Sequence, residues 1–228
     1  MVRARKKFTK KELKEDKFIL FALKAKDFLE QNASRIGLVV LGAVVLFFGF
    51  TYYKNQQKEK TAQGALALIQ AQMTIQQGNQ QAAMEKLSNI AEQYSGTPAG
   101  AQATYALGRY YLEKGEFETA RQYFERYLDD YGDDPVLKAA ALAGYADCLL
   151  NQGKPEEAAN FYEKAARVDP DFPQSPGYLF SAAQAYLDAG RLDKAEALAR
   201  EVMEKYPKSE YKDRAALVAQ MARLKQAG

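Results

Sequence analysis

Histidine and tryptophan are absent from this 228-residue chain, and cysteine occurs once, as Cys148. Without histidine the chain cannot form a His-based metal site, a Ser-His-Asp triad or a Cys-His catalytic pair. A single cysteine forms no internal disulfide, so packing alone must hold the fold together. No glycine-rich phosphate-binding motif opens a predicted helix. We therefore expect a protein that is not an enzyme and that uses no cofactor.

The remaining candidates for a chemical site have simpler interpretations. Acidic residues gather at Asp129–Asp130 with Asp133–Asp134, and at Asp169 with Asp171. These positions coincide with predicted turns, so we interpret them as solvated or helix-capping carboxylates rather than as calcium ligands. Cys148 lies inside a predicted helix, where it is expected to act as a small packing residue rather than as a nucleophile.

One long stretch, residues 36–53, contains no charge, Asn, Gln or Pro: IGLVVLGAVVLFFGFTYY. As a helix it would extend about 27 Å, close to the roughly 30 Å hydrocarbon core of a bilayer. Tyr52 and Tyr53 stand where an interfacial aromatic belt would lie. A buried helix of a soluble domain is the alternative, but every other predicted helix here intersperses charges. The stretch therefore predicts a single membrane span, acting as an uncleaved signal anchor.

Charge is distributed unevenly about this span. Residues 1–35 hold 11 Lys and Arg against 5 Asp and Glu, whereas residues 54–228 hold 21 against 24. The positive-inside rule places the basic leader in the cytoplasm and the larger C-terminal part across the membrane. For a bacterium this means an inner-membrane protein with a periplasmic domain.

The leader itself carries a helical pattern. Thr9 and Glu12 have capping-box spacing, and apolar residues then recur along one helix face. These residues are Phe18, Phe21, Ala22, Ala25, Phe28 and Leu29. A basic amphipathic helix can lie among anionic lipid headgroups, although a plain topology signal explains the same charge. Because a membrane accounts for the basic residues, we do not expect nucleic-acid binding.

After a polar stalk at 54–63, four segments share one pattern, and their glycines are 37, 38 and 37 residues apart. The segments are 64–98, 101–135, 139–170 and 176–207, with Gly78, Gly115, Gly153 and Gly190. In each segment an alanine follows the glycine by five residues, as in Gly115 and Ala120. The pattern resembles the tetratricopeptide repeat (TPR), a helix–turn–helix unit of 34 residues. We place the extra residues in the connections between units.

The resemblance implies an all-α fold: one transmembrane helix, then a TPR α-solenoid of about four helical hairpins, and a capping helix at 209–228. Each glycine is expected to end the first helix of its unit in a left-handed cap. The aromatic residues fill the space between hairpins, and a proline ends the second helix of each unit. In the cap, Tyr211, Ala215, Val218, Met221 and Ala222 form the predicted apolar face.

The first helices of such units line a concave groove, which is the candidate site for a peptide or protein ligand. The TPR register places these residues there: Gln102, Tyr105, Arg109, Leu112, Asp147, Leu150, Phe180, Gln184 and Leu187. The three leucines can equally well pack between helices. Arg109 alone does not reproduce the Lys/Asn/Arg set with which some TPR domains clamp a C-terminal carboxylate. We therefore expect an extended or helical apolar segment as ligand.

The order of basic leader (TKKELKEDKF), uncleaved span, divergent repeats and cap helix resembles the YfgM-like family of ancillary SecYEG translocon subunits. The resemblance implies a periplasmic TPR domain associated with the Sec translocon and with periplasmic chaperones, but it transfers no site residue. The competing hypothesis is a TPR scaffold for another envelope assembly, such as cytochrome c maturation, cell-division coordination or outer-membrane biogenesis.

Overall fold

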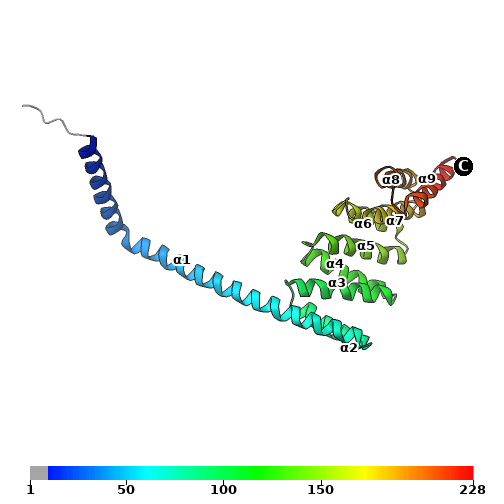
Figure 1. Cartoon of the computed structure of the whole chain (residues 1–228), viewed down its shortest axis with the longest axis horizontal. Helices are drawn as coiled ribbons and strands as arrows, with labels where there is room; N and C mark the ends of the chain where they lie inside the picture. Colours follow the sequence, from blue (N-terminus) through cyan, green and yellow to red (C-terminus); the bar gives the residue numbers. More distant parts are fainter. Residues whose placement is uncertain (1–9, 228) are drawn as a thin grey trace, which may run out of the picture. The chain divides into compact units, whose positions relative to one another are not determined.

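The computed structural model describes residues 10–227, and every regular element in this range is an α-helix (Figure 1). The chain divides into two compact units, Met1–Lys58 and Glu59–Gly228, and the boundary falls inside the predicted stalk. The long helix α1 (Lys10–Gln76) contributes residues to both units. Thr9 of the predicted capping box lies outside the described residues.

In the first unit, α1 exposes its apolar residues. Leu46 is 75% exposed and Val39 is 72% exposed, and none of the most apolar window of Gly37–Gln76 is buried. Among the described residues this is the one helix long and apolar enough to cross a membrane. The Thr51 hydroxyl donates to the carbonyl of Phe47 at 3.0 Å, so its polarity is satisfied within the helix.

The leader residues Phe21, Phe28 and Leu29 also lie on α1 and are 54–71% exposed. The side chains of Phe18 and Ala22 lie outside the described residues. The polar segment 54–63 is helical as well. Within the second unit, Lys60 Nζ donates to the Ser95 carbonyl at 2.9 Å.

The second unit is an array of helical hairpins in which each helix from α2 onward packs against the next (Figure 1). Its helices are α2 (Gln80–Gln93), α3 (Pro98–Glu113), α4 (Phe117–Asp130), α5 (Pro135–Asn151), α6 (Pro155–Val168), α7 (Ser175–Asp188), α8 (Leu192–Lys205) and α9 (Lys212–Ala227). Contacts also join α3 to α5 and α7 to α9, as expected when successive hairpins stack. The predicted all-α repeat array is confirmed.

The four aligned glycines end the first helix of their hairpins in nearly the same conformation. The φ angles of Gly78, Gly115, Gly153 and Gly190 are 79°, 76°, 74° and 72°. L-residues with a Cβ rarely adopt this left-handed region, which explains why glycine recurs at this point in each unit. The predicted left-handed caps are therefore confirmed.

The predicted role of proline is wrong in two of the four units. Helix α2 ends at Gln93 and α4 at Asp130, before Pro98 and Pro135, which instead occupy the first turn of α3 and α5. A proline at the start of a helix costs no backbone hydrogen bond because its missing N–H would have no partner there. Gly96 and Gly132, with φ of 75° and 59°, turn the chain between these helices.

Phe124 joins the second and third hairpins. Its ring is fully buried and faces glycines on two helices, Gly108 of α3 and Gly144 of α5. A Cβ added at Gly108 would lie 2.9 Å from the ring, and one added at Gly144 would overlap it. The small residues therefore make the space in which the aromatic ring packs.

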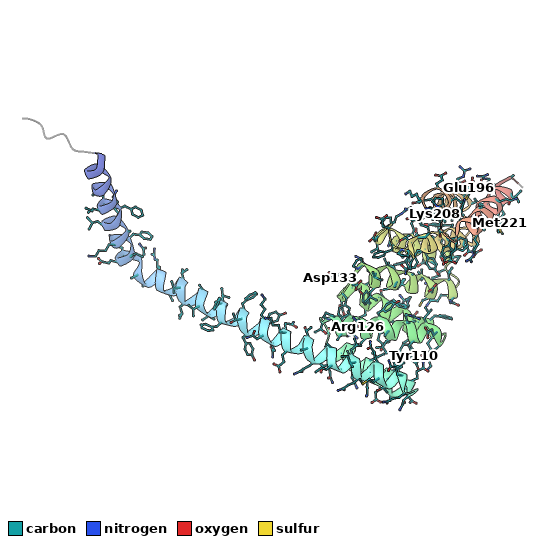
Figure 2. All side chains as sticks on the ribbon, viewed as in Figure 1. Tyr110, Arg126, Asp133, Glu196, Lys208 and Met221 are labelled. Carbon is teal, nitrogen blue, oxygen red and sulfur yellow. The ribbon has the colours of Figure 1, made fainter. Side chains whose placement is uncertain are left out.

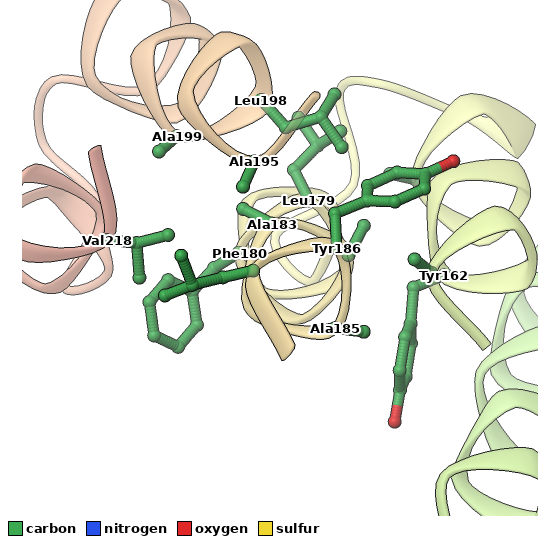
Figure 3. Packing of buried hydrophobic residues seen from close by; sticks show 14 of the residues in the cluster. Tyr162, Leu179, Phe180, Ala183, Ala185, Tyr186, Ala195, Leu198, Ala199 and Val218 are labelled. Carbon is green, nitrogen blue, oxygen red and sulfur yellow. The ribbon is translucent and has the colours of Figure 1, made fainter. Parts of the chain in front are cut away.

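The largest apolar cluster lies in α5–α9, and Figure 3 shows part of it around α7. Alanines such as Ala183 and Ala195 allow close helix approach, while Leu179 and Tyr186 fill the space between helices. The Tyr186 hydroxyl donates to Asn160 Oδ1 at 2.7 Å, which satisfies its polar end.

Helix α9 covers the end of this cluster with Ala215, Val218, Ala219 and Ala222, which are buried. The predicted apolar face is wrong at Met221, which is 49% exposed. Leu217 and Leu224 of the same helix are exposed as well, and Figure 2 labels Met221. Immediately before α9, the ring of Tyr211 packs on that of Phe180, with the ring centroids 5.5 Å apart.

Candidate peptide-binding groove

A groove of about 590 Å³ lies between the first helices of the first three hairpins. Its lining residues come from the end of α1, from α2, from α3 and from the start of α5: Leu68, Gln72, Ile75, Leu87, Gln102, Tyr105, Ala106, Asp134, Val136 and Leu137. Gln102 and Tyr105, two of the residues predicted from the TPR register, are among these lining residues. Ile75 and Val136 are 45% and 53% exposed, so the groove offers apolar side chains to a ligand.

A second cleft, of about 340 Å³, adjoins the groove and shares Gln102, Asp134 and Leu137 with it. Asp130 and Asp133 also line this cleft, and its lining includes no lysine or arginine. Asp133 lies at the turn between α4 and α5 (Figure 2). Asp134 caps α5, because its Oδ1 accepts from the backbone N–H of Val136 at 2.9 Å and of Leu137 at 3.1 Å.

Tyr105 is half-buried at the wall of the groove, against the rings of Phe124 and Tyr127 at centroid distances of 6.0 Å each. Burial raises the pKa of Tyr105, and the positive charge of Arg109 and a hydrogen bond with it oppose that shift. Arg109 is exposed and its guanidinium donates to Glu113 Oε1 at 2.8 Å. The one predicted cation of the groove is thus already engaged by neighbours on its own helix.

Asp147 lies one hairpin further along, on α5. Its Oδ1 accepts a short hydrogen bond from the hydroxyl of Tyr162, which projects from α6. Burial raises the pKa of the Asp147 carboxyl, and this hydrogen bond partly offsets the effect. Burial of the ring, together with the charge of Asp147 and this hydrogen bond, raises the pKa of Tyr162 above its usual range.

Tyr178 on α7 was not among the predicted groove residues, and its ring packs against the buried cluster of α5–α9. Burial raises the pKa of its half-buried hydroxyl, and the charges of Tyr105 and Asp147 add to that shift.

The other predicted residues divide by exposure. Leu112 and Leu150 are partly buried and pack against core clusters, whereas Gln184 is exposed. Phe180 and Leu187 are only 3% and 6% exposed, so the prediction that they line an open surface is wrong. Phe180 is covered by Tyr211, just before α9, and by the Arg214 guanidinium of α9, which lies 4.4 Å from the ring centroid.

Cys148 is fully buried beside Asp147 and packs with Ala120, Phe124 and Ala141. Burial, together with the neighbouring carboxylate, raises the pKa of the Cys148 thiol to about 12. A thiol that stays protonated is a poor nucleophile and metal ligand. In residues 10–227, no three His, Cys, Asp or Glu side chains come together as a metal site would require.

Comparison with known families supports the fold. A family profile described as "Tetratricopeptide repeat-like domain" matches residues 26–169, and one described as "Tetratricopeptide repeat" matches residues 149–221. The first match begins within the basic leader, so it includes the apolar run 36–53. No curated protein matches the chain.

Solved structures with the same arrangement include TPR-like repeats of a Podosopora anserina protein described as a putative kinesin light chain. A variant of that protein aligns with a TM-score of 0.56 and 17% identity over 73% of this chain and 88% of the other. A second structure of these repeats gives 0.52 and 18% over 73% and 96%. At such identity the likeness concerns the fold. With the profile match over more than half of its length, the chain belongs to the tetratricopeptide repeat-like domain family.

Proposed function

We propose that this protein is a membrane-anchored TPR scaffold that binds proteins or peptides in the bacterial cell envelope. The observation that carries the proposal is α1, a single helix that supplies both an exposed apolar stretch and the first helix of the repeat array. A protein-binding array tethered in this way acts at a membrane. TPR units are typically non-catalytic, and the buried thiol and engaged Arg109 fit binding better than catalysis.

The basic leader favours a cytoplasmic N-terminus and a periplasmic repeat domain. The topology can be tested in a Cys148→Ala background with single cysteines at Lys24 in the leader and Lys208 beyond α8, both of which are exposed. A membrane-impermeant maleimide applied to spheroplasts should label the Lys208→Cys variant alone. Labelling of Lys24→Cys alone would show the opposite orientation. Labelling of both variants in intact spheroplasts would argue against a membrane span.

We further propose that the partner is the Sec translocon with its exported chains and periplasmic chaperones, as the YfgM-like resemblance suggests. Anchoring beside a translocon exit would give the groove a high effective concentration of emerging chains, so a weak affinity would suffice. The profile match from residue 26 onward, which covers leader and apolar run as well as repeats, supports an architecture of this type.

The test is photocrosslinking of the full chain in native membranes. A photoreactive residue replaces Val45 in the apolar stretch or Gln102 in the groove, and Gln122, exposed on α4, is the matched control. We expect Val45 to capture translocon subunits and Gln102 to capture exported chains or chaperones, with little capture at Gln122. Recovery of one defined envelope complex without the translocon would favour the competing scaffold hypothesis, and equal capture at Gln102 and Gln122 would remove the groove from the proposal.

A further inference from the structure

The cleft of about 340 Å³ beside the groove (the acidic cleft) has negative charge on its walls and no positive charge. Asp130, Asp133 and Asp134 line it, and its lining contains no lysine or arginine. These residues are the last of α4, a residue of the turn that follows, and the N-terminal cap of α5. The connection between the second and third hairpins therefore brings three carboxyl groups to one cleft.

The acidic cleft keeps carboxylate oxygens free for a ligand. Within residues 10–227 the side chain of Asp133 forms no hydrogen bond and no ion pair. Asp134 caps α5 through Oδ1, so its other oxygen remains open. Asp130 is already paired, because Arg126 Nε lies 3.6 Å from its Oδ2. Asp133 is thus the carboxylate most available to a group that enters the cleft.

The hydroxyl of Tyr127 is a second, independent feature of the acidic cleft. Tyr127 lines the cleft although the residue is only 1% exposed. Its hydroxyl makes no hydrogen bond with any described residue, yet it is not among the fully enclosed polar atoms that lack a partner. The hydroxyl therefore reaches open space at the cleft. Because polar groups of buried side chains normally have partners, this unpartnered hydroxyl indicates a place for a ligand.

The chemistry of these groups suits a cation that donates hydrogen bonds. Burial, together with the charges of Asp134, Tyr105 and Asp133, raises the pKa of Tyr127 to about 12, so its hydroxyl stays neutral and its oxygen can accept. A metal ion fits less well, because in the described chain no three His, Cys, Asp or Glu side chains come together as ligands. An ammonium or guanidinium group on a flexible stem meets the requirement.

The groove supplies the rest of the binding surface. It shares Gln102, Asp134 and Leu137 with the acidic cleft, so one ligand can lie in both. Ile75 and Val136 offer exposed apolar side chains in the groove. A peptide segment in which apolar residues flank a basic residue complements both features, whereas a C-terminal carboxylate would meet charges of its own sign.

We infer that the acidic cleft is a subsite for a lysine or arginine side chain of a peptide segment bound in the adjoining groove. The inference rests on the proposed function and names the chemistry of the bound segment. The cation donates to the free carboxylate of Asp133 and to the hydroxyl oxygen of Tyr127, while the flanking apolar side chains pack in the groove. Asp133 is exposed in the free protein, so its pairing with a cation adds selectivity rather than most of the affinity.

The experiment measures binding of short fluorescent peptides to the full chain in nanodiscs of zwitterionic lipid, with empty nanodiscs as the background. One peptide alternates leucine and serine around a central lysine, and two others carry acetyl-lysine or norleucine at that position. We expect the lysine peptide to bind about fivefold more tightly than either neutral peptide, the upper range for an exposed ion pair. The preference should shrink at high salt. This comparison uses the unaltered protein, so it does not depend on whether a variant folds.

Two variants locate the subsite, and a third is the matched control. Asp133→Asn should reduce the preference for lysine to about twofold or less, because it removes the free carboxylate. Asp129→Asn changes the net charge equally at an exposed residue that lines neither the groove nor the acidic cleft, and it should retain the preference. Tyr127→Phe should weaken binding of the lysine peptide and leave the norleucine peptide unaffected.

The outcomes separate the subsite from the groove. Equal binding of the three peptides by the unaltered protein would overturn the subsite and leave the groove function standing. An equal loss of preference in Asp129→Asn and Asp133→Asn would show diffuse attraction to an acidic surface, which would also overturn the subsite. Failure of all three peptides to bind would contradict the proposed groove function and the subsite with it.

Discussion

The two ends of the repeat array differ in how well they are packed. The first hairpin, the end of α1 with α2, shares a small buried cluster with α3, and α1 leaves Leu66, Ile69 and Met73 about half exposed or more. The last two hairpins and α9 share the largest buried cluster of the described residues. Because stability in a solenoid is a sum of repeat and interface contributions, equal hairpin geometry need not mean equal local stability.

The comparison teaches that repeat geometry and repeat stability have different origins in this chain. The left-handed glycines have almost the same φ in all four units, including the first, so the hairpin turn is specified locally. The burial that stabilises a hairpin depends instead on its neighbours. The first hairpin has a neighbour on one side, whereas α7 packs against α6, α8 and α9.

The largest expected effect comes from separating the two regions at Phe124. Phe124→Ala removes the ring that packs between Gly108 and Gly144, and we expect a loss of about 3–5 kcal/mol in the free energy of unfolding. Denaturant unfolding followed by circular dichroism should then show two transitions in place of one. Tyr110→Ala, a change at a partly exposed ring on α3 (Figure 2), is the control and should keep a single transition. A single transition in both variants would mean that the two regions are coupled by other contacts.

A smaller effect is expected from the ion pair that ties α6 to α8. Arg167 donates through two nitrogens to Glu201, with Nη2 to Oε2 at 2.6 Å, and these bonds with Lys205 lower the pKa of Glu201 to about 2. Glu201→Gln should cost about 1.5–3 kcal/mol at pH 7, the range for hydrogen bonds to charged groups. The matched control is Glu204→Gln, an exposed residue on the same helix.

The pH dependence of this pair has a definite sign. The folded pKa of Glu201 lies below its ordinary value of 4.5, so the pair stabilises the fold above that pH and its contribution is lost as the pH falls from 4.5 toward 2. Thermal melts of the protein and of Glu201→Gln should therefore converge in this window. A gap that persists at pH 2 would show that Glu201 stabilises through packing rather than through charge.

Hydrogen exchange should sharpen the comparison between the two ends without any substitution. Amides of α2 are expected to exchange at least about tenfold faster than those of α7, which corresponds to about 1.4 kcal/mol in local opening free energy. Mass spectrometry of the full chain in nanodiscs measures both helices in one sample. Equal protection of α2 and α7 would show that the array opens as one unit.

The smallest expected effect concerns Asp147. Its folded pKa is raised, so its ionised form costs stability once the pH exceeds that value, and the cost disappears below the ordinary pKa of 3.8. Asp147→Asn should therefore stabilise the protein by less than about 1 kcal/mol at neutral pH and change nothing at pH 3. Thermal melts at both values test this. A destabilised variant at pH 7 would mean that the charge of Asp147 supports the fold.

The sequence predicted the hairpins well because their signals are local. A glycine with an alanine five residues later specifies a turn and a close helix contact, and neither depends on distant residues. The helix starts were less predictable. Pro98 and Pro135 follow the end of one helix and precede the start of the next, so their position in the sequence fits both roles and only the structure decides between them.

Only some of the groove residues could be predicted from the sequence, and the reason differs from one residue to the next. Gln102 and Tyr105 follow from the repeat register alone. Phe180 fits the same register but is covered by the connection to α9, and repeat spacing carries no information on that contact. Leu68 and Ile75 of α1, which line the groove, were missed because the first unit departs most from the repeat pattern.

The buried thiol of Cys148 can serve as a chemical probe of local opening of α5. A fully buried thiol with a pKa raised to about 12 cannot react with alkylating reagents until α5 opens locally. As the one thiol in the sequence, it would report that opening without an introduced label or a competing signal. The rate of its modification therefore measures how often the third hairpin opens. A ligand that binds in the groove and stabilises the array would lower this rate in proportion to the stability it adds.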